Sequence, residues 1–168
     1  MLKNIAITLT LISFLSGCAI MARPYQDVNG NNIAELTVTN SFGAPMFAHT
    51  YAEEKQCRSQ YLIGYLQQNE SKTIKISTDQ KFAYRLHAGF YSSCMFTIGF
   101  QPSIGKKYTT TMIYNSELEV CELSLREELD NGSSKKVDNA YVKSNSGGTR
   151  MDQNSTWCSK DELDKYAQ

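Results

Sequence analysis

The sequence predicts an all-β protein folded as an antiparallel β-sandwich. Apolar and polar residues alternate with a period of two through most of the chain, which is the pattern of strands buried on one face. Residues that favour turns separate these stretches at intervals of about 8–13 residues, as in sandwiches and barrels. Helix signals are few, so we expect about seven to nine strands and at most a short C-terminal helix.

Seven segments carry the alternation clearly. In residues 81–90, for example, Phe82, Tyr84 and Leu86 share one face, while small and polar residues occupy the other. The β-branched and aromatic content of these segments also favours strands. The predicted strands, in order, are 34–40, 45–51, 71–78, 81–90, 94–100, 107–115 and 118–129.

Three segments depart from this pattern. Residues 51–62 are long enough for a helix of about three turns, but they lack a clean apolar face, so they are a candidate helix and not one of the expected elements. Residues 130–156 are rich in Asn, Ser and Gly, and we expect one more short strand there, around Tyr141, between two loops. Residues 155–168 predict a short terminal helix, because they contain a Ser-x-x-Glu pattern typical of helix N-termini.

The N-terminal residues predict export. Lys3 is the only charged residue in 1–17, and an apolar run of about a dozen residues follows it. That run is too short to cross a hydrocarbon core of about 30 Å, which takes about 20 residues. A positive start, a short apolar run and small residues at its end are typical of a secretory signal peptide.

Leu15-Ser16-Gly17-Cys18 resembles the lipobox of bacterial lipoproteins, which is a Leu and two small residues before a Cys. The resemblance implies cleavage after Gly17 and acyl chains on the sulfur and the new amino group of Cys18. Several acyl chains anchor a protein durably, whereas one chain binds only marginally. Because Ala19 rather than Asp follows the Cys, the resemblance further implies the outer membrane, with the domain on its periplasmic or surface face.

The expected domain organisation follows from this cleavage. Residues 1–17 are the signal peptide, residues 18–32 are the lipidated N-terminus with a flexible tether, and residues 33–168 form one disulfide-bonded β-sandwich domain. Pro24 and several Asn oppose regular structure in the tether. Lys3 leaves with the signal peptide, so the mature chain has 16 basic residues against 17 acidic ones, and this balance does not favour a nucleic-acid partner.

Four cysteines remain once Cys18 carries lipid. An even number in an exported chain predicts two disulfides, and four cysteines allow three pairings. We prefer Cys57–Cys94 with Cys121–Cys158, because the second bond holds a C-terminus that otherwise frays. The alternative pairing is Cys94–Cys121 with Cys57–Cys158.

Two kinds of sandwich are open, immunoglobulin-like and transthyretin-like. Residues 100–111, with the sequence FQPSIGKKYTTT, resemble a pattern in small β-sandwich lipoproteins of the cell envelope. This resemblance favours the sandwich and leaves its strand order open.

The sequence lacks the common catalytic motifs. It has two histidines, His49 and His87, both on predicted strands, and no Gly-x-Ser-x-Gly motif accompanies them. It contains neither Cys-x-x-Cys nor His-x-x-x-His, so we expect no metal and no cofactor. We therefore predict that the protein is not an enzyme.

The aromatic residues are best suited to binding, because Tyr offers a large contact area with a polar end. Phe90 and Tyr91 lie in a predicted loop beside Cys94 and are our candidate binding residues, although Phe90 could instead close one end of the core.

We predict a non-catalytic binding or structural module of the cell envelope. Its expected partners are the membrane, through the N-terminal lipid, and an envelope protein or peptidoglycan. The alternatives are an inhibitor or immunity-type lipoprotein that blocks another protein and, second, a small hydrolase.

Overall fold

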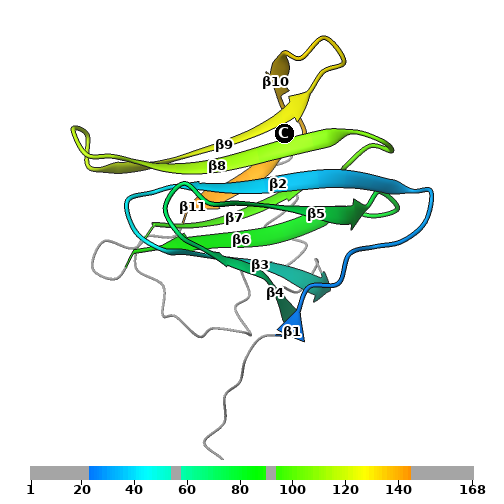
Figure 1. The fold of residues 1–168 in the computed structure, drawn as a ribbon, viewed down its shortest axis with the longest axis horizontal. Helices are drawn as coiled ribbons and strands as arrows, with labels where there is room; N and C mark the ends of the chain where they lie inside the picture. The colour runs from blue at the N-terminus through cyan, green and yellow to red at the C-terminus, as the bar shows by residue number, and fades with distance from the viewer. Residues whose placement is uncertain (1–22, 54–57, 90–93, 145–168) are drawn as a thin grey trace, which may run out of the picture.

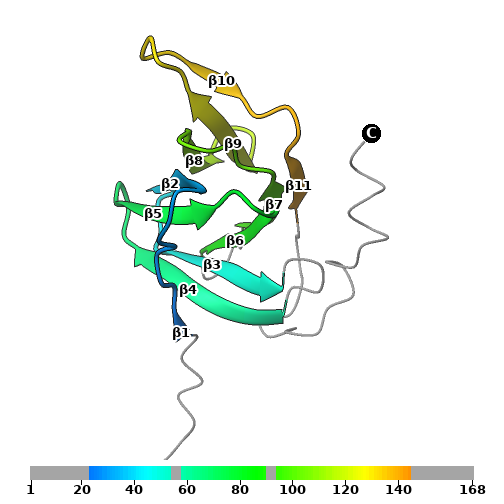
Figure 2. The same cartoon turned by 90° about the vertical axis from the view of Figure 1, so that its right-hand side faces the viewer.

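The computed structural model describes residues 23–53, 58–89 and 94–144, which form a β-sandwich (Figure 1). Figure 2 shows its two layers, one sheet with the order β1-β4-β3-β6-β7-β11 and one with the order β10-β9-β8-β2-β5. The first sheet contains β1 (Arg23–Pro24), β3 (Met46–Glu53), β4 (Arg58–Leu66), β6 (Phe82–Ala88), β7 (Cys94–Phe100) and β11 (Tyr141–Ser144). The second contains β2 (Ile33–Ser41), β5 (Ser71–Ser77), β8 (Lys107–Asn115), β9 (Val120–Glu128) and β10 (Ser134–Lys136). The predicted all-β sandwich is confirmed.

The core lies between the inner faces of the two sheets. On β2, Leu36 and Val38 are fully buried and alternate with half-buried residues. Leu36 lies opposite Ile74 of β5 and beside Tyr108 of β8 in the same sheet. Side chains of the other sheet, among them Leu86, complete the same core. The period-two alternation in the sequence is therefore the inward and outward alternation of these strands.

The candidate helix over 51–62 is not found in the described residues of that range, which belong to β3 and β4. These strands form an antiparallel hairpin in which Met46 lies opposite Leu66. The register shifts between Ala48 and His49, which accommodates one extra residue in the hairpin. Tyr51 of β3 is buried in this hairpin, so burial as a strand outweighs the weak local preference for a helix.

The two sheets are mixed rather than purely antiparallel, which corrects the predicted pairing. The pairs β2–β8 and β1–β4 are parallel. In the immunoglobulin arrangement the first two strands share a sheet, whereas the first two long strands here, β2 and β3, lie in different sheets. The strand order is therefore not that of an immunoglobulin domain. Eight strands of seven to nine residues, β2 to β9, agree with the predicted number, and β1, β10 and β11 are shorter.

The Asn- and Ser-rich segment after β9 contains two short strands in its described part. β10 pairs with β9 and β11 pairs with β7, so the chain passes from one sheet to the other between them. The strand predicted around Tyr141 is confirmed as β11, and the Tyr141 ring lies against Gly99, where a Cβ atom would clash with it. The helix predicted over 155–168 lies outside the described residues.

Residues 23–32 follow the surface of the sandwich instead of forming a free tether. β1 pairs with β4, and the Tyr25 hydroxyl donates a 2.8 Å hydrogen bond to the carbonyl oxygen of Lys75 in β5. The Lys75 backbone N–H donates a 3.0 Å bond to the Asp27 carboxylate. These contacts join the edges of both sheets, so the flexible tether predicted for 18–32 is wrong from residue 23 onward. The rest of that range lies outside the described residues.

Candidate functional site

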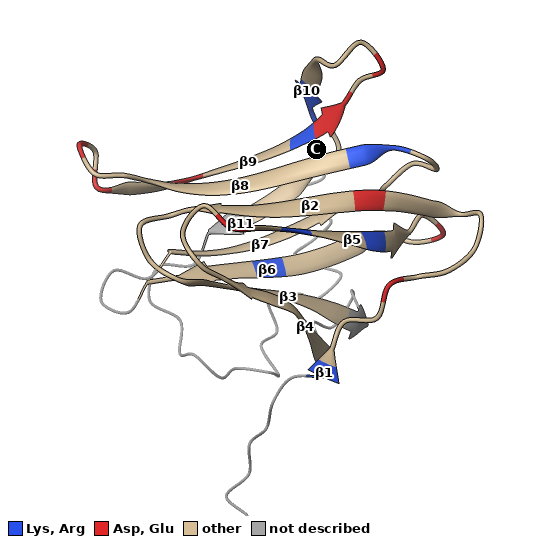
Figure 3. Cartoon of the chain, viewed as in Figure 1, with Lys and Arg blue, Asp and Glu red and all other residues tan. Residues whose placement is uncertain are grey.

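Exposed apolar side chains gather at the end of the hairpin formed by β8 and β9. Leu118 is 67% exposed, Val120 43% and Ile113 42%. Figure 1 shows this hairpin reaching the far end of the sandwich, and Figure 3 shows acidic residues at the same place. We call this feature the hairpin tip, and it consists of Ile113, Glu117, Leu118, Glu119, Val120 and Glu122.

Hydrogen bonds within the turn give the hairpin tip a defined shape. The Asn115 Oδ1 atom accepts bonds from the backbone N–H groups of Glu117 and Leu118, both at 3.1 Å. Such bonds from an Asn side chain to the following backbone are typical of tight turns. The Asn115 Nδ2 atom also donates a 3.1 Å bond to Glu122, which ties the two strands together. Glu119 closes the turn with a φ of 53°, in the left-handed region.

A disulfide bond between Cys94 and Cys121 joins the hairpin tip to the other sheet. Cys121 follows the exposed Val120 in β9, and Cys94 is the first residue of β7. Each cysteine has one partner, so both of our preferred pairs, Cys57–Cys94 and Cys121–Cys158, are wrong. The observed bond belongs to the alternative pairing, whose other members, Cys57 and Cys158, lie outside the described residues.

Next to the hairpin tip, β8 packs against the buried and hydrogen-bonded segment of the chain that follows β2. The Tyr114 ring lies 5.5 Å from the ring of Phe42, measured between centroids. The Phe42 backbone N–H donates a 2.9 Å bond to Asn40, whose side chain is fully buried. Asn40 in turn donates to the carbonyl oxygens of Ala44 at 3.0 Å and Leu66 at 2.9 Å. The support beneath the hairpin is therefore both packed and hydrogen-bonded.

The hairpin tip offers apolar contact bordered by negative charge on a rigid support. A surface of this kind suits a protein partner that has an apolar pocket with a basic rim. Because the turn is already ordered in the free protein, less conformational entropy is lost when a partner binds. Sequence reasoning missed this site because Leu118 and Val120 fell inside the strand predicted at 118–129, although their positions share the outward side with Glu122, and two apolar residues on that side were the available signal. In the structure β9 begins only at Val120, and Leu118 belongs to the turn.

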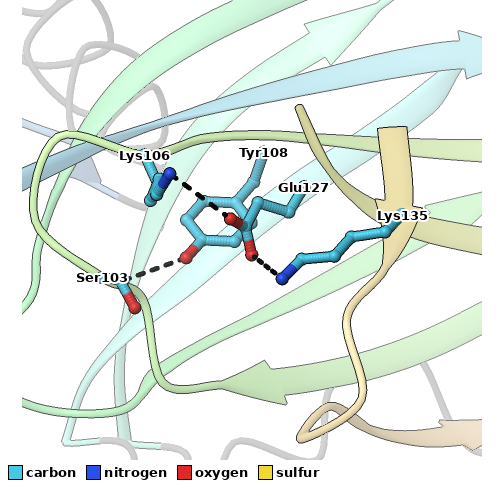
Figure 4. Close-up of polar contacts among 5 residues, drawn as sticks. All are labelled: Ser103, Lys106, Tyr108, Glu127 and Lys135. Carbon is cyan, nitrogen blue, oxygen red and sulfur yellow. Dashed lines mark hydrogen bonds and ion pairs between the residues drawn. The ribbon is translucent and has the colours of Figure 1, made fainter. Parts of the chain in front are cut away.

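A cluster of charged and polar side chains lies at the end of β8 and β9 that is opposite the hairpin tip (Figure 4). The Glu127 carboxylate lies 3.8 Å from Lys106 Nζ and 3.4 Å from Lys135 Nζ. The Tyr108 hydroxyl accepts a 3.0 Å hydrogen bond from the Ser103 backbone N–H. The side chains of Lys106 and Lys135 are 37% and 54% exposed and that of Glu127 is 15% exposed, so solvent partly screens these ion pairs. The pairs link the turn before β8 and the short strand β10 to β9.

The two histidines lie on the outer face of the six-stranded sheet. His49 of β3 is opposite Arg85 of β6, and His87 is opposite Phe47. Burial lowers the pKa of His49 from 6.5 to about 4, and the charges of Arg85 and His87 act in the same direction. A base with this pKa is a poor proton acceptor for catalysis near neutral pH. The surroundings of His49 therefore give no support to a hydrolase.

The other predicted site residues, the lipidation residue Cys18 and the candidate binding residues Phe90 and Tyr91, lie outside the described residues. Across residues 23–53, 58–89 and 94–144, no three His, Cys, Asp or Glu side chains gather where they could hold a metal ion. In this same part of the chain, no helix is long and apolar enough to cross a membrane.

No protein-family model matches this sequence, and no curated protein is significantly similar to it.

Proposed function

We propose that the protein is a lipid-anchored, non-catalytic binding module of the bacterial cell envelope, held to the membrane by acyl chains on Cys18. The observation that supports this proposal is the short distance along the chain from the lipobox to the first fixed strand, β1. Five residue steps separate Cys18 from Arg23, which at about 3.4 Å per residue span at most about 17 Å. A domain attached in this way stays beside the bilayer.

Replacing the lipid-bearing thiol tests the anchor. We expect Cys18→Ser to move the protein from the membrane fraction to the soluble fraction, and metabolic labelling with a fatty acid to mark only the wild type. Ser16→Ala is the matched control, because it keeps a small residue before the cleavage site, and it should stay with the membrane. A Cys18→Ser protein that still sediments with membranes would refute the anchor.

The proposed partner is an envelope protein that binds the hairpin tip. An isolated exposed Leu needs no explanation, but Leu118, Val120 and Ile113 lie together at the end of a hairpin whose turn is hydrogen-bonded and whose second strand is held by a disulfide. The acidic border predicts basic residues on the partner.

The hairpin tip also favours the second candidate function, an inhibitor or immunity-type lipoprotein. A narrow, rigid, apolar turn can enter the cleft of another protein, as a flat sheet cannot. An inhibitor forms a tight complex of fixed stoichiometry with one enzyme. A structural module instead co-purifies with envelope machinery or peptidoglycan.

Site-specific crosslinking separates these functions. A photocrosslinking amino acid at Leu118 should capture an envelope protein in intact cells. The same amino acid at Asp130, which is exposed beyond the other end of β9, should not capture it. A single enzyme whose activity falls in the complex indicates an inhibitor, and a structural envelope component indicates a binding module. Equal capture from both positions, or none from Leu118, would remove the hairpin tip from the proposal.

A further inference from the structure

The first part of β9 is an open edge of the five-stranded sheet. β10 is the last strand in the order of this sheet, and it pairs with β9 only from Arg126 to Glu128. Within the part of the chain that the structure describes, no strand pairs with residues 120–124 on the side away from β8. Figure 1 shows this part of β9 at the margin of the sandwich, between the hairpin tip and β10. We call residues 120–124 the open edge.

The alternation of the backbone identifies the groups that point out from the open edge. The Leu125 carbonyl oxygen accepts a 3.3 Å bond from the N–H of Val137, which directly follows β10, so Leu125 faces away from β8. The pairing of β8 with β9 has an unbroken register over residues 120–127, and in such a strand every second residue directs its N–H and C=O to the same side. Cys121 and Leu123 therefore direct their N–H and C=O groups out of the open edge, as Leu125 does.

The open edge lacks the protection that exposed sheet edges usually carry. Charged side chains, Pro, bulges or a covering segment usually keep such edges from pairing with other chains. On the other side of the same sheet, the Val28 N–H donates a 3.2 Å bond to the carbonyl oxygen of Lys75 and so covers part of β5. Two of the three residues of β10 are lysines. The open edge has no bulge, no Pro and no Lys, and Glu122 is its one charged residue.

Half-buried apolar side chains accompany the outward backbone groups. Cys121 and Leu123 pack against the core between the sheets but are only partly buried. Val120 and Glu122 alternate with them and are exposed on the outer face of the sheet. A strand added here would therefore bury apolar surface on the inner face and meet Val120 and Glu122 on the outer face.

The backbone groups and the charge of Glu122 specify the occupant. A row of N–H and C=O groups that repeats every two residues, at about 6.8 Å, matches another extended polypeptide. A second copy of this chain, paired antiparallel over the whole open edge, would place Glu122 opposite the same residue of that copy, and like charges in such a pair are destabilising. A basic residue opposite Glu122 is stabilising instead. The charge therefore favours a partner strand over self-association.

We propose that the open edge binds by strand addition. An extended segment of a partner protein pairs with the backbone groups of Cys121 and Leu123, places a basic residue opposite Glu122 and flanks that residue with apolar ones. This inference rests on the proposed function, since it describes how the partner of the hairpin tip is held. The main-chain hydrogen bonds supply affinity, and Glu122 and Val120 select the sequence of the added strand.

Amide hydrogen exchange, followed by nuclear magnetic resonance, tests the open edge in the free protein. The experiment uses the full-length chain, isotopically labelled and extracted in detergent. The N–H groups of Cys121 and Leu123 should exchange at least about tenfold faster than those of Glu122 and Ser124, which face β8 by the same alternation. Equal protection of all four amides would overturn the proposal.

A short peptide is the probe for the added strand. The acetylated and amidated peptide Thr-Val-Lys-Val-Ile, paired antiparallel, places its Lys opposite Glu122 and its Ile opposite Val120. At millimolar concentration it should slow amide exchange at Cys121 and Leu123. N-methylation of both Val residues should abolish this slowing, because their N–H groups face the open edge. N-methylation of the Lys, whose N–H faces away, is the matched control and should preserve it.

Charge reversal tests the selection by Glu122. Glu122→Lys should weaken binding of the peptide about fivefold, and a peptide with Glu in place of its Lys should bind this variant as the original peptide binds the wild type. Glu128→Lys is the matched control, because it makes the same change on the same face of β9 but about 20 Å away, beside β10. It should change the affinity by less than about twofold, since the distance exceeds the screening length.

Three results with the peptide or the protein alone would overturn strand addition: no slowing at Cys121 and Leu123, equal slowing by the peptide methylated on both Val residues, or slowing that appears without peptide as the protein concentration rises. The last result would assign the edge to a second copy. Failure of the proposed function appears elsewhere, in crosslinking from Leu118. Capture from Leu118 with an edge that binds no peptide would refute only strand addition, whereas peptide binding without capture would refute only the proposed partner.

Discussion

Removing the disulfide beneath the hairpin tip should cost much of the stability of the domain. Cys94 and Cys121 are 27 residues apart in the sequence. In the chain-entropy model, closing a loop of that length destabilises the unfolded chain by about 3.5 kcal/mol. Alanine at Cys94, which is buried, also removes packed volume, so the expected loss for Cys94→Ala/Cys121→Ala is at least that large. A domain of this size is stable by only about 5–15 kcal/mol.

Urea denaturation followed by far-UV circular dichroism measures this loss. With a slope of about 2 kcal/mol per molar urea, the unfolding midpoint should fall by about 1.5–2 M. Thr39→Ala is the control, because its hydroxyl bonds only to Ser71 on the exposed face, and it should change the free energy by no more than about 0.5 kcal/mol. A loss below about 1 kcal/mol in the double variant would refute the reasoning, since the loop would then not be constrained by this bond.

Four further predictions follow from individual side chains. Asn40→Ala should lower the free energy of unfolding in urea by about 3 kcal/mol, because it removes two buried hydrogen bonds and one part-buried hydrogen bond of about 1 kcal/mol each. Gly99→Ala should lower it by about 1–3 kcal/mol by displacing the Tyr141 ring, and a thermal melt should show this. Leu118→Glu should leave the melt within about 1 °C of the wild type but abolish partner capture, because the side chain is 67% exposed. The free energy of unfolding of the wild type should fall by at most about 3 kcal/mol as the pH falls from 6.5 to 4. The pKa of His49 is near 4 only in the folded protein, so the unfolded state binds the proton first and is favoured as the pH falls. Urea titrations at each pH should show that His49→Gln removes this loss.

The alternation of the sequence was sufficient to predict most strands, since inward and outward residues differ in polarity. The alternation did not predict β4. In this strand the neighbouring residues Tyr61 and Leu62 are both half-buried, and the register of its pairing with β3 shifts between Ala48 and His49. A segment with a bulge in its pairing does not alternate cleanly, so its strand character depends on the partner strand rather than on its own sequence.

The disulfide pairing depends on tertiary structure in the same way. Cys94 and Cys121 meet because β7 and β9, which are neighbours in neither sequence nor sheet, face each other across the sandwich. Strand order decides this, and the sequence left the strand order open. The same holds for Leu118, whose exposure depends on where the turn begins rather than on its own hydrophobicity.

β1, which follows the proposed anchor in the chain, and the hairpin tip lie towards opposite ends of the sandwich (Figure 1), which bears on the kind of partner that the tip can meet. Tyr25 and Asp27 bond to Lys75, Lys75 lies opposite Glu35, and Glu35 is paired with Lys107 at the start of β8. From there β8 runs nine residues, about 30 Å, before the turn begins. The tip is therefore well separated from β1, the first described strand after the proposed lipid on Cys18. With that proposed anchor, the separation favours a protein partner for the apolar residues of the tip, and the acidic border favours basic residues on that protein.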